Sequence, residues 1–177
     1  KAAKHTYKRE YPTTPEDAFS AGEGAKFQEW NREIHVQFDA DWYPPISWKK
    51  IRAYDGGYST RAACKWYAIS PDGWIVAYRE YYPQRVVDAE QAETIRAMSR
   101  DPDGKPEEIS YTIADPACWQ RKSDSGESTA DVFARHGVHM EPGSNDRVNG
   151  WKRLHEYFRP FEDEEGRLIA RLMHTAA

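Results

Sequence analysis

Apolar and polar positions alternate along three consecutive segments in the first half of the chain, which predicts three β-strands. We expect these strands over residues 49–54, 62–69 and 74–82. Ser70-Pro71-Asp72-Gly73 separates the last two and is typical of a tight hairpin turn. The three strands are therefore expected to be antiparallel neighbours in one sheet.

After Pro83 the apolar positions follow a helical period. We expect helices over residues 88–98, 128–136 and 145–158, with Asp88 capping the first, and a strand over residues 109–114. The last helix carries one apolar stripe, formed by Val148, Trp151, Leu154, His155 and Phe158. A strand that follows a sheet strand through a helix is usually a parallel crossover.

This order of elements is that of the ribonuclease-H-like α/β fold. It predicts a mixed central sheet, with three antiparallel strands and then a parallel strand after a helical crossover, flanked by helices. We assign this domain to residues 46–177, which end in a turn at Glu165-Gly166 and a short strand. Residues 1–45 hold a helix start at Thr14-Pro15 and several prolines, and they predict a linker with a helix.

Composition narrows the class of protein. Of the 177 residues, 39% are hydrophobic and 14% aromatic, which favours a folded domain with a core. The net charge of −4 disfavours a general nucleic-acid coat or a polybasic membrane binder. No apolar run approaches the roughly 18 residues of a membrane helix. Cys64 and Cys118 form no CxxC pair and are expected to be core thiols.

Two aspartates follow predicted strands, where ligands and metals collect in α/β sheets. Asp55 ends the first strand ahead of two glycines, and Asp115 ends the strand beyond the crossover. If these strands are neighbours, the two carboxylates lie side by side and need a cation such as Mg²⁺ or Mn²⁺ to ionise together. The alternative is that each aspartate only caps a turn.

Five local segments together resemble the C-terminal nuclease domain of the large terminase subunit of tailed bacteriophages. They are Tyr11-Pro12-Thr13-Thr14-Pro15-Glu16-Asp17-Ala18-Phe19, Tyr54-Asp55-Gly56-Gly57-Tyr58-Ser59, Tyr78-Arg79-Glu80-Tyr81-Tyr82, Ala114-Asp115-Pro116-Ala117-Cys118-Trp119 and Asn145-Asp146-Arg147-Val148-Asn149-Gly150-Trp151. The resemblance implies a ribonuclease-H-like endonuclease that uses two Mg²⁺ or Mn²⁺ ions to cut concatemeric viral double-stranded DNA during genome packaging. It also implies that residues 1–45 lead from an ATPase domain. No GxxxxGK[ST] phosphate loop of such a motor occurs in these residues.

The resemblance makes Asp55 and Asp115 the catalytic residues and metal ligands. The family's third acidic ligand lies further downstream, so we expect it beyond Ala177. Asp146 is the nearest substitute, although capping its helix is an equally good role for it. Glu80 is a candidate accessory ligand, or else a solvated charge at a strand end.

Basic residues on the loops after the two aspartates are candidate DNA contacts, namely Arg61, Arg121 and Lys122. The alternative for each of them is a solvated surface charge. The implied partners of the full-length protein are the portal protein and the small terminase subunit, and the implied location is the host bacterial cytoplasm, with no membrane.

Two other functions stay open. One is a non-catalytic domain that docks DNA or the portal with an incomplete metal site, and the other is a relative of transposases or resolvases. The first and last of the five segments argue against the second of these.

Overall fold

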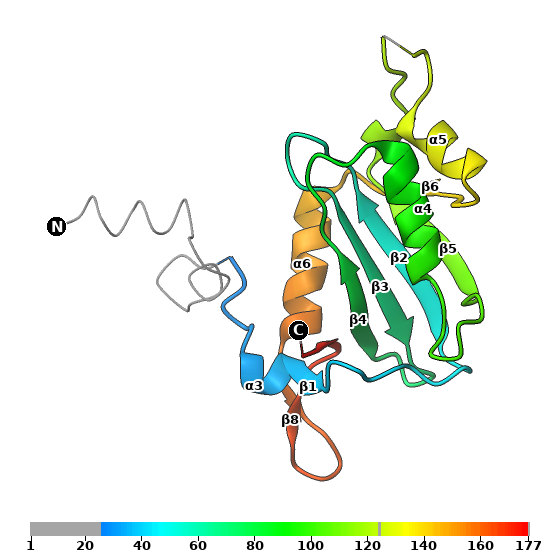
Figure 1. Ribbon diagram of the computed structural model, residues 1–177. Helices are drawn as coiled ribbons and strands as arrows, with labels where there is room; N and C mark the ends of the chain where they lie inside the picture. Colours follow the sequence, from blue (N-terminus) through cyan, green and yellow to red (C-terminus); the bar gives the residue numbers. More distant parts are fainter. Residues whose placement is uncertain (1–25, 124, 177) are drawn as a thin grey trace, which may run out of the picture.

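A seven-stranded mixed sheet forms the centre of the domain in the computed structural model, which describes residues 26–123 and 125–176 (Figure 1). The strand order across the sheet is β1-β9-β4-β3-β2-β5-β6. Its strands are β1 (Val36–Phe38), β2 (Lys49–Asp55), β3 (Ala63–Ile69), β4 (Ile75–Tyr81), β5 (Ile109–Ala114), β6 (Glu141–Pro142) and β9 (Leu172–Thr175). The three predicted antiparallel strands and the strand beyond the crossover lie at the middle of this sheet.

The register of the central strands follows their alternating sequence pattern. β2 and β3 pair antiparallel, as do β3 and β4, while β5 pairs parallel with the other side of β2. Arg52, Tyr54 and Trp66 point to one face and are buried there. The strand bounds differ from the predicted ones by only one residue at some ends, because the turns at Ser70–Gly73 and after Asp55 fix them.

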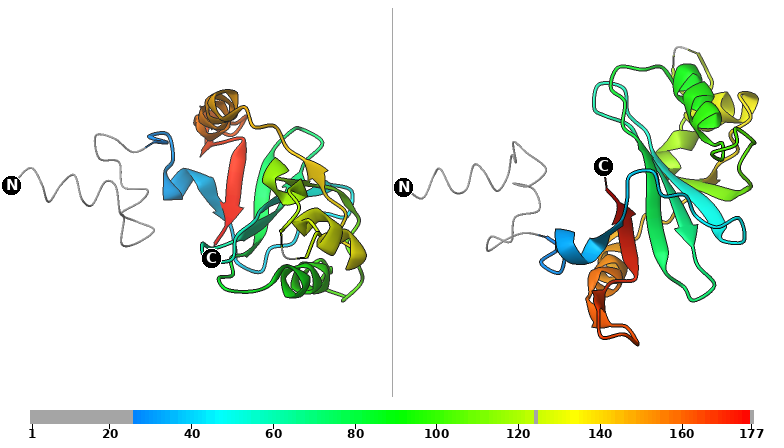
Figure 2. Two further views of the ribbon diagram at one scale, coloured as in Figure 1. Left: turned by 90° about the horizontal axis from the view of Figure 1, so that it is seen from above. Right: turned by 60° about the horizontal axis from the view of Figure 1, so that its bottom comes forward.

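Two helices cover that buried face. They are α4 (Asp88–Met98) and α5 (Thr129–Arg135), and a short 3₁₀ turn, η1 (Pro116–Trp119), precedes α5. α6 (Arg147–Phe158) lies on the opposite side of the sheet (Figure 2). Trp66 and Phe133 are fully buried at the centre of the core between the sheet and the first two helices. Within the described ranges, no helix is long and apolar enough to cross a membrane.

The segment ahead of residue 46 contributes to the sheet. β1 pairs parallel with β9, which in turn pairs parallel with β4. The predicted linker therefore contains a strand of the domain, preceded by α3 (Arg32–His35). The helix start expected at Thr14-Pro15 lies outside the described residues.

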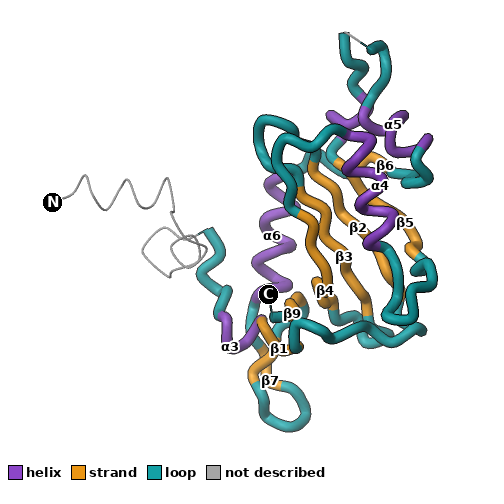
Figure 3. The backbone as a smooth tube through the Cα atoms, in the orientation of Figure 1, coloured by secondary structure: helices purple, strands orange, loops and turns teal. Residues whose placement is uncertain are grey.

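The end of the chain forms more structure than its sequence predicts. β7 (Phe161–Glu162) and β8 (Leu168–Ile169) form a small hairpin that projects from the lower end of the domain (Figure 3). Its turn has Gly166 at φ 75°, a left-handed conformation that glycine adopts without strain.

The apolar stripe expected on α6 is present, but most of it is not buried. Val148 is 60% exposed and Trp151 is 41% exposed, and Phe158 is the residue of this helix that is buried. The helix is held at its last turn, where the ring nitrogen Nε2 of His35 lies 2.9 Å from the Phe158 carbonyl oxygen. Its first two turns therefore have little packing that would bury the stripe.

This arrangement predicts that the same substitution at two valines changes the free energy of unfolding by different amounts. Val138→Ala, at a position only 1% exposed in the core, should lower the free energy of unfolding by about 2 kcal/mol through lost burial and a residual cavity. Val148→Ala, on the exposed part of α6, should change it by less than about 0.5 kcal/mol, since surface substitutions cost little. Urea denaturation measures both, and an equal loss at the two positions would show that α6 packs against the domain after all.

Candidate active site

The two aspartates singled out from the sequence lie at the same edge of the sheet. β2 and β5 are parallel neighbours, with Tyr54 opposite Ala114. Asp55 and Asp115 are the next residues on each strand, and the Asp115 amide donates a hydrogen bond of 3.3 Å to the Tyr54 carbonyl oxygen. Paired strands run about 4.8 Å apart, so the two backbones are adjacent where the carboxylates leave them. This is the upper edge of the sheet in Figure 1, where α4 begins.

The loop after Asp55 turns too tightly for any residue but glycine at position 57. A Cβ atom on Gly57 would lie 2.7 Å from the carbonyl oxygen of Arg61. The buried side chain of Gln91 on α4 fixes this loop, because its amide donates to the Gly57 carbonyl at 3.1 Å and to the Val86 carbonyl at 2.7 Å. Its Oε1 accepts from the Tyr54 hydroxyl at 2.9 Å. One side chain therefore ties α4 to the strand and loop on either side of Asp55.

The carboxylates of Asp55 and Asp115 differ in their hydrogen bonds. Asp115 caps η1, since its Oδ1 accepts from the Ala117 amide at 2.7 Å. The turn-capping role considered from the sequence is thus present at Asp115. It occupies one oxygen, and among the described residues no group hydrogen-bonds to Oδ2 of Asp115 or to either oxygen of the exposed Asp55. Three carboxylate oxygens at this edge are thus left without a partner in the described part of the chain.

A third acid, Asp88, acts electrostatically on the same buried thiol as the pair. It is the first residue of α4, whose cap position is Val87, so the predicted capping role of Asp88 is wrong. Its Oδ2 accepts from the Lys122 ammonium and from the Thr129 hydroxyl, both at 2.7 Å. Burial, assisted by the charges of Asp115, Asp55 and Asp88, raises the pKa of the Cys118 thiol to about 11. The three acids therefore share one electrostatic environment, and Cys118 is a neutral thiol packed behind them.

Glu80 lies on β4, with β3 between it and β2. Its carboxylate pairs with the Lys65 ammonium at 2.7 Å across the β3–β4 ladder. Because two strand spacings are about 10 Å, Glu80 is not beside the aspartate pair. The ion pair compensates its charge locally.

Asp146 is the N-cap of α6, and its Oδ1 accepts from the Asn149 amide at 3.1 Å. This backbone hydrogen bond lowers the pKa of the Asp146 carboxyl, which fits the capping alternative. Among the described residues, no three His, Cys, Asp or Glu side chains are close enough together to hold a metal ion. The structure thus brings Asp55 and Asp115 together, pairs Glu80 with Lys65 and uses Asp146 as a helix cap.

The three basic candidates occupy loops at the same end of the sheet, and each already has a partner. Arg61 donates to the Tyr82 carbonyl at 3.2 Å and lies over the Tyr82 ring. Arg121 donates to the Gly126 carbonyl at 2.9 Å, and Lys122 forms the ion pair with Asp88. All three are exposed. Within the described part of the chain, Arg61 and Arg121 hydrogen-bond only to carbonyl oxygens, whereas the charge of Lys122 is compensated by Asp88.

Sequence reasoning missed Asp88 and Gln91 as parts of this site. The sequence predicts only a capping role for Asp88, because a polar residue before an apolar period is a common capping signal. Only the tertiary packing of α4 against β2 shows that they face the aspartate edge. The sequence carries no signal for this contact, because the burial of Gln91 and its hydrogen bond to Gly57 are seen only in the folded domain.

Gln91→Leu should destabilise the domain because it removes three hydrogen bonds and leaves the Tyr54 hydroxyl buried without an acceptor. We expect a loss of about 3 kcal/mol in the free energy of unfolding, measured by urea denaturation. Gln84→Leu is the matched control, since Gln84 is exposed and makes one hydrogen bond, to the Ser59 carbonyl. Equal effects of the two substitutions would contradict the structural role of Gln91.

Comparison with known proteins adds evidence on the fold. No model of a protein family matches the chain, and no curated protein matches it. Several solved structures are similar. The nuclease domain of the P22 large terminase is 17% identical with a TM-score of 0.63, and the match covers 88% of this chain and 74% of that one. The large terminase of a thermophilic bacteriophage is 15% identical with a TM-score of 0.63, over 99% of this chain.

The chain spans 40% of the length of the thermophilic bacteriophage's large terminase. At these identities the comparison bears on the fold, and it confirms the ribonuclease-H-like architecture predicted from the order of elements. The mixed sheet, with its central antiparallel strands and the parallel strand beyond the crossover, matches in both cases across most of this chain. The chain therefore folds as a large-terminase nuclease-like domain.

Proposed function

We propose that this chain is the nuclease domain of a viral DNA-packaging enzyme, and that it hydrolyses phosphodiester bonds of double-stranded DNA with divalent metal ions. The observation that carries the proposal is the side-by-side placement of Asp55 and Asp115 at the ends of two parallel central strands. The fold it shares with the P22 nuclease domain supports the same reaction class.

The donor set at this edge fits Mg²⁺ or Mn²⁺. Both ions prefer oxygen ligands, and Mg²⁺ is commonly held by one or two carboxylates together with water and substrate phosphate. Asp55 and Oδ2 of Asp115 supply carboxylate oxygens to which no other described residue hydrogen-bonds. A pair of such ions, when bound, activates water and stabilises the leaving oxygen in phosphodiester hydrolysis.

In the proposed reaction, the protein's own residues hold negative charges for the metal ions and positive charges for the DNA phosphates at fixed positions. Asp55 and Asp115 hold negative charge at fixed positions, because the strand ladder and the η1 cap fix their backbones. Lys122 neutralises Asp88, which limits the acid excess that would otherwise repel DNA phosphates. Arg61 and Arg121 on the flanking loops are placed to bind those phosphates.

A non-catalytic role in docking DNA or the portal protein is the second candidate. It is favoured by the absence of a three-ligand group among the described residues. In either role, we propose that the domain works with its own ATPase domain, the portal protein and the small terminase subunit. Its place of action would be the cytoplasm of the host bacterium.

Removing the negative charge of either aspartate tests the proposed nuclease activity. Asp55→Asn and Asp115→Asn should each reduce Mn²⁺-dependent nicking of supercoiled plasmid by at least about 100-fold, the scale of losing a key electrostatic group in an active site. Asparagine retains an acceptor for the Ala117 amide, so the η1 cap persists and folding should be unchanged. Agarose gels of plasmid incubated with Mn²⁺, Mg²⁺ or EDTA measure the nicking.

Asp72→Asn, in the exposed β3–β4 turn, is the control and should nick like the unchanged protein. Metal-independent nicking, or full activity in both asparagine variants, would contradict the proposed enzyme. Intact plasmid under every condition, in a chain that still binds Mn²⁺ and DNA, would support the docking role instead.

Phosphate contacts make DNA affinity depend on salt. Arg61→Ala and Arg121→Ala should each flatten the slope of log K against log salt by about 0.9, the value for one phosphate contact on duplex DNA. Fluorescence anisotropy with a labelled duplex measures the slope. Lys105→Ala removes an exposed lysine of the α4–β5 loop and should leave the slope unchanged. An equal change of the slope in all three variants would mean that DNA affinity depends on the net charge of the domain and not on contacts of Arg61 and Arg121 with phosphates.

A further inference from the structure

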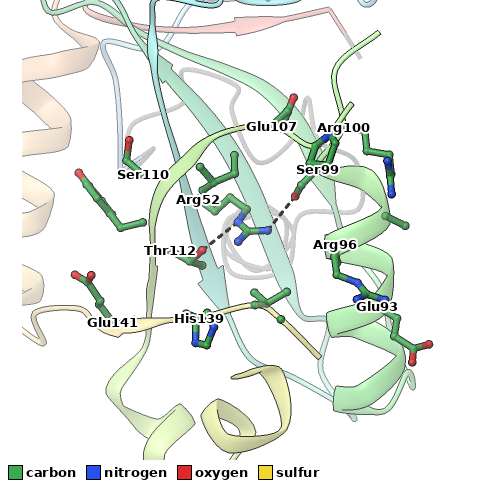
Figure 4. A pocket seen from close by; sticks show the side chains of 16 residues that line it. Arg52, Glu93, Arg96, Ser99, Arg100, Glu107, Ser110, Thr112, His139 and Glu141 are labelled. Carbon is green, nitrogen blue, oxygen red and sulfur yellow. Dashed lines mark hydrogen bonds between the residues drawn. The ribbon is translucent and has the colours of Figure 1, made fainter. Parts of the chain in front are cut away.

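A second polar site lies on the other face of β2, away from the aspartate edge. A cavity of about 700 Å³ opens between α4, β5 and the segment that joins α5 to β6 (Figure 4). Its size is in the range of small-molecule binding sites. Its lining includes Arg52, Arg96, Arg100 and His139, and neither Asp55 nor Asp115.

Arg52 is the unusual member of this cavity, because its charged side chain is only 7% exposed. Its Nε donates to the Thr112 hydroxyl at 3.0 Å and its Nη1 to the Ser99 hydroxyl at 2.9 Å. A guanidinium group has five N–H donors, so three remain beyond these two bonds. In the described part of the chain, no carboxylate forms an ion pair with Arg52.

Burial of a charge without a paired counter-ion is costly and needs a reason. The nearby acid Glu107 pairs through Oε2 with Arg79 at 3.0 Å and accepts there from the Tyr78 hydroxyl at 3.2 Å, while its Oε1 is buried without a hydrogen-bond partner among the described residues. Glu107 therefore offsets part of the charge of Arg52 without bonding to it. Both partners of Arg52 are neutral hydroxyls, and Ser99 is itself fixed by the Trp66 indole at 3.0 Å. The guanidinium is thus held in place by neutral groups, with N–H donors left for a ligand in the cavity.

Other nitrogen-bearing side chains face the same cavity. Arg96, on the exposed side of α4, makes no ion pair among the described residues, and His139 is exposed at the opposite wall. Glu93 is engaged with His136, at 3.2 Å. Glu141 at the β6 end is left as an acceptor for hydroxyl or amino groups (Figure 4). The cavity therefore has an anion-binding end and an acceptor end.

We propose that this cavity binds a small phosphate ester of nucleotide size, with its phosphate on Arg52 and Arg96 and its hydroxyl or amino groups toward Glu141. Arginine binds phosphate oxygens through paired N–H donors, which suits the fixed guanidinium of Arg52. Arg52 and Asp55 belong to the same strand, so such a ligand would contact the strand that carries one of the two candidate catalytic aspartates. The proposal concerns a separate site and does not require nuclease activity.

Titration of the ¹⁵N-labelled full chain with AMP, followed by NMR at physiological salt, tests this site. We expect saturable shifts of the Arg52 Nε–H signal and of backbone amides in residues 96–100 and 109–112. Arg96→Ala should weaken AMP binding about tenfold, the effect of losing one charge-assisted hydrogen bond. Arg32→Ala removes an arginine of α3, far from the cavity, and should leave binding unchanged.

Inorganic phosphate and succinate identify the ligand chemistry. Phosphate should bind the same residues more weakly than AMP, because it leaves the acceptor end empty. Absence of saturable shifts with AMP, or equal effects of Arg96→Ala and Arg32→Ala, would overturn the site. Binding of succinate or phosphate as tight as that of AMP would overturn the assignment to a phosphate ester. Arg52→Lys, which keeps the charge and loses the fork of donors, should weaken AMP binding in a protein whose spectrum shows it folded.

Discussion

The parallel pairing of β2 with β5 is the constraint on which the candidate active site depends. It joins segments separated by β3, β4 and α4 in the chain, and its register sets Tyr54 opposite Ala114. The hydrogen bond from the Asp115 amide to the Tyr54 carbonyl extends that ladder to the point where both carboxylates emerge. A slip of one residue would turn one aspartate to the opposite face, where α4 packs.

The buried side of the sheet supports this edge with polar groups as well as apolar packing. Gln91 links α4 to Tyr54 and to the loop after Asp55, while Ser99 links the end of the same helix to Arg52 and Trp66. Buried polar networks of this kind specify one arrangement, because each unpaired member would cost free energy. The position of α4 is thus fixed at both of its ends, and with it the position of Asp88 at the first residue of the helix.

The sequence predicts the centre of the fold and the aspartate pair, because both depend on local signals: alternation, turn residues and an acid at the end of each strand. The sequence does not predict β1, and the short strand expected after Glu165-Gly166 has no predicted partner, since strands of two to four residues carry too little periodicity and gain their stability from pairing. The stripe of α6 is a real helical period, but periodicity alone does not say whether a face finds a partner. Glu80 is a locally plausible ligand, and only its cross-strand contact shows that it pairs with Lys65, whereas the capping role of Asp146 is already one of the two alternatives that the sequence offers. Whether an acidic residue is free to bind a metal or is used in an ion pair or a cap is therefore decided by the contacts of the folded domain.

Diffraction from crystals of this chain soaked in Mn²⁺ tests the central claim most directly. The account predicts an anomalous manganese peak at the upper sheet edge, with oxygen atoms of both Asp55 and Asp115 among its ligands at about 2.1 Å, close to the distance expected for a hard divalent cation. A peak bound by neither aspartate, or carboxyl groups more than about 10 Å apart, too far for a shared two-ion site, would contradict it.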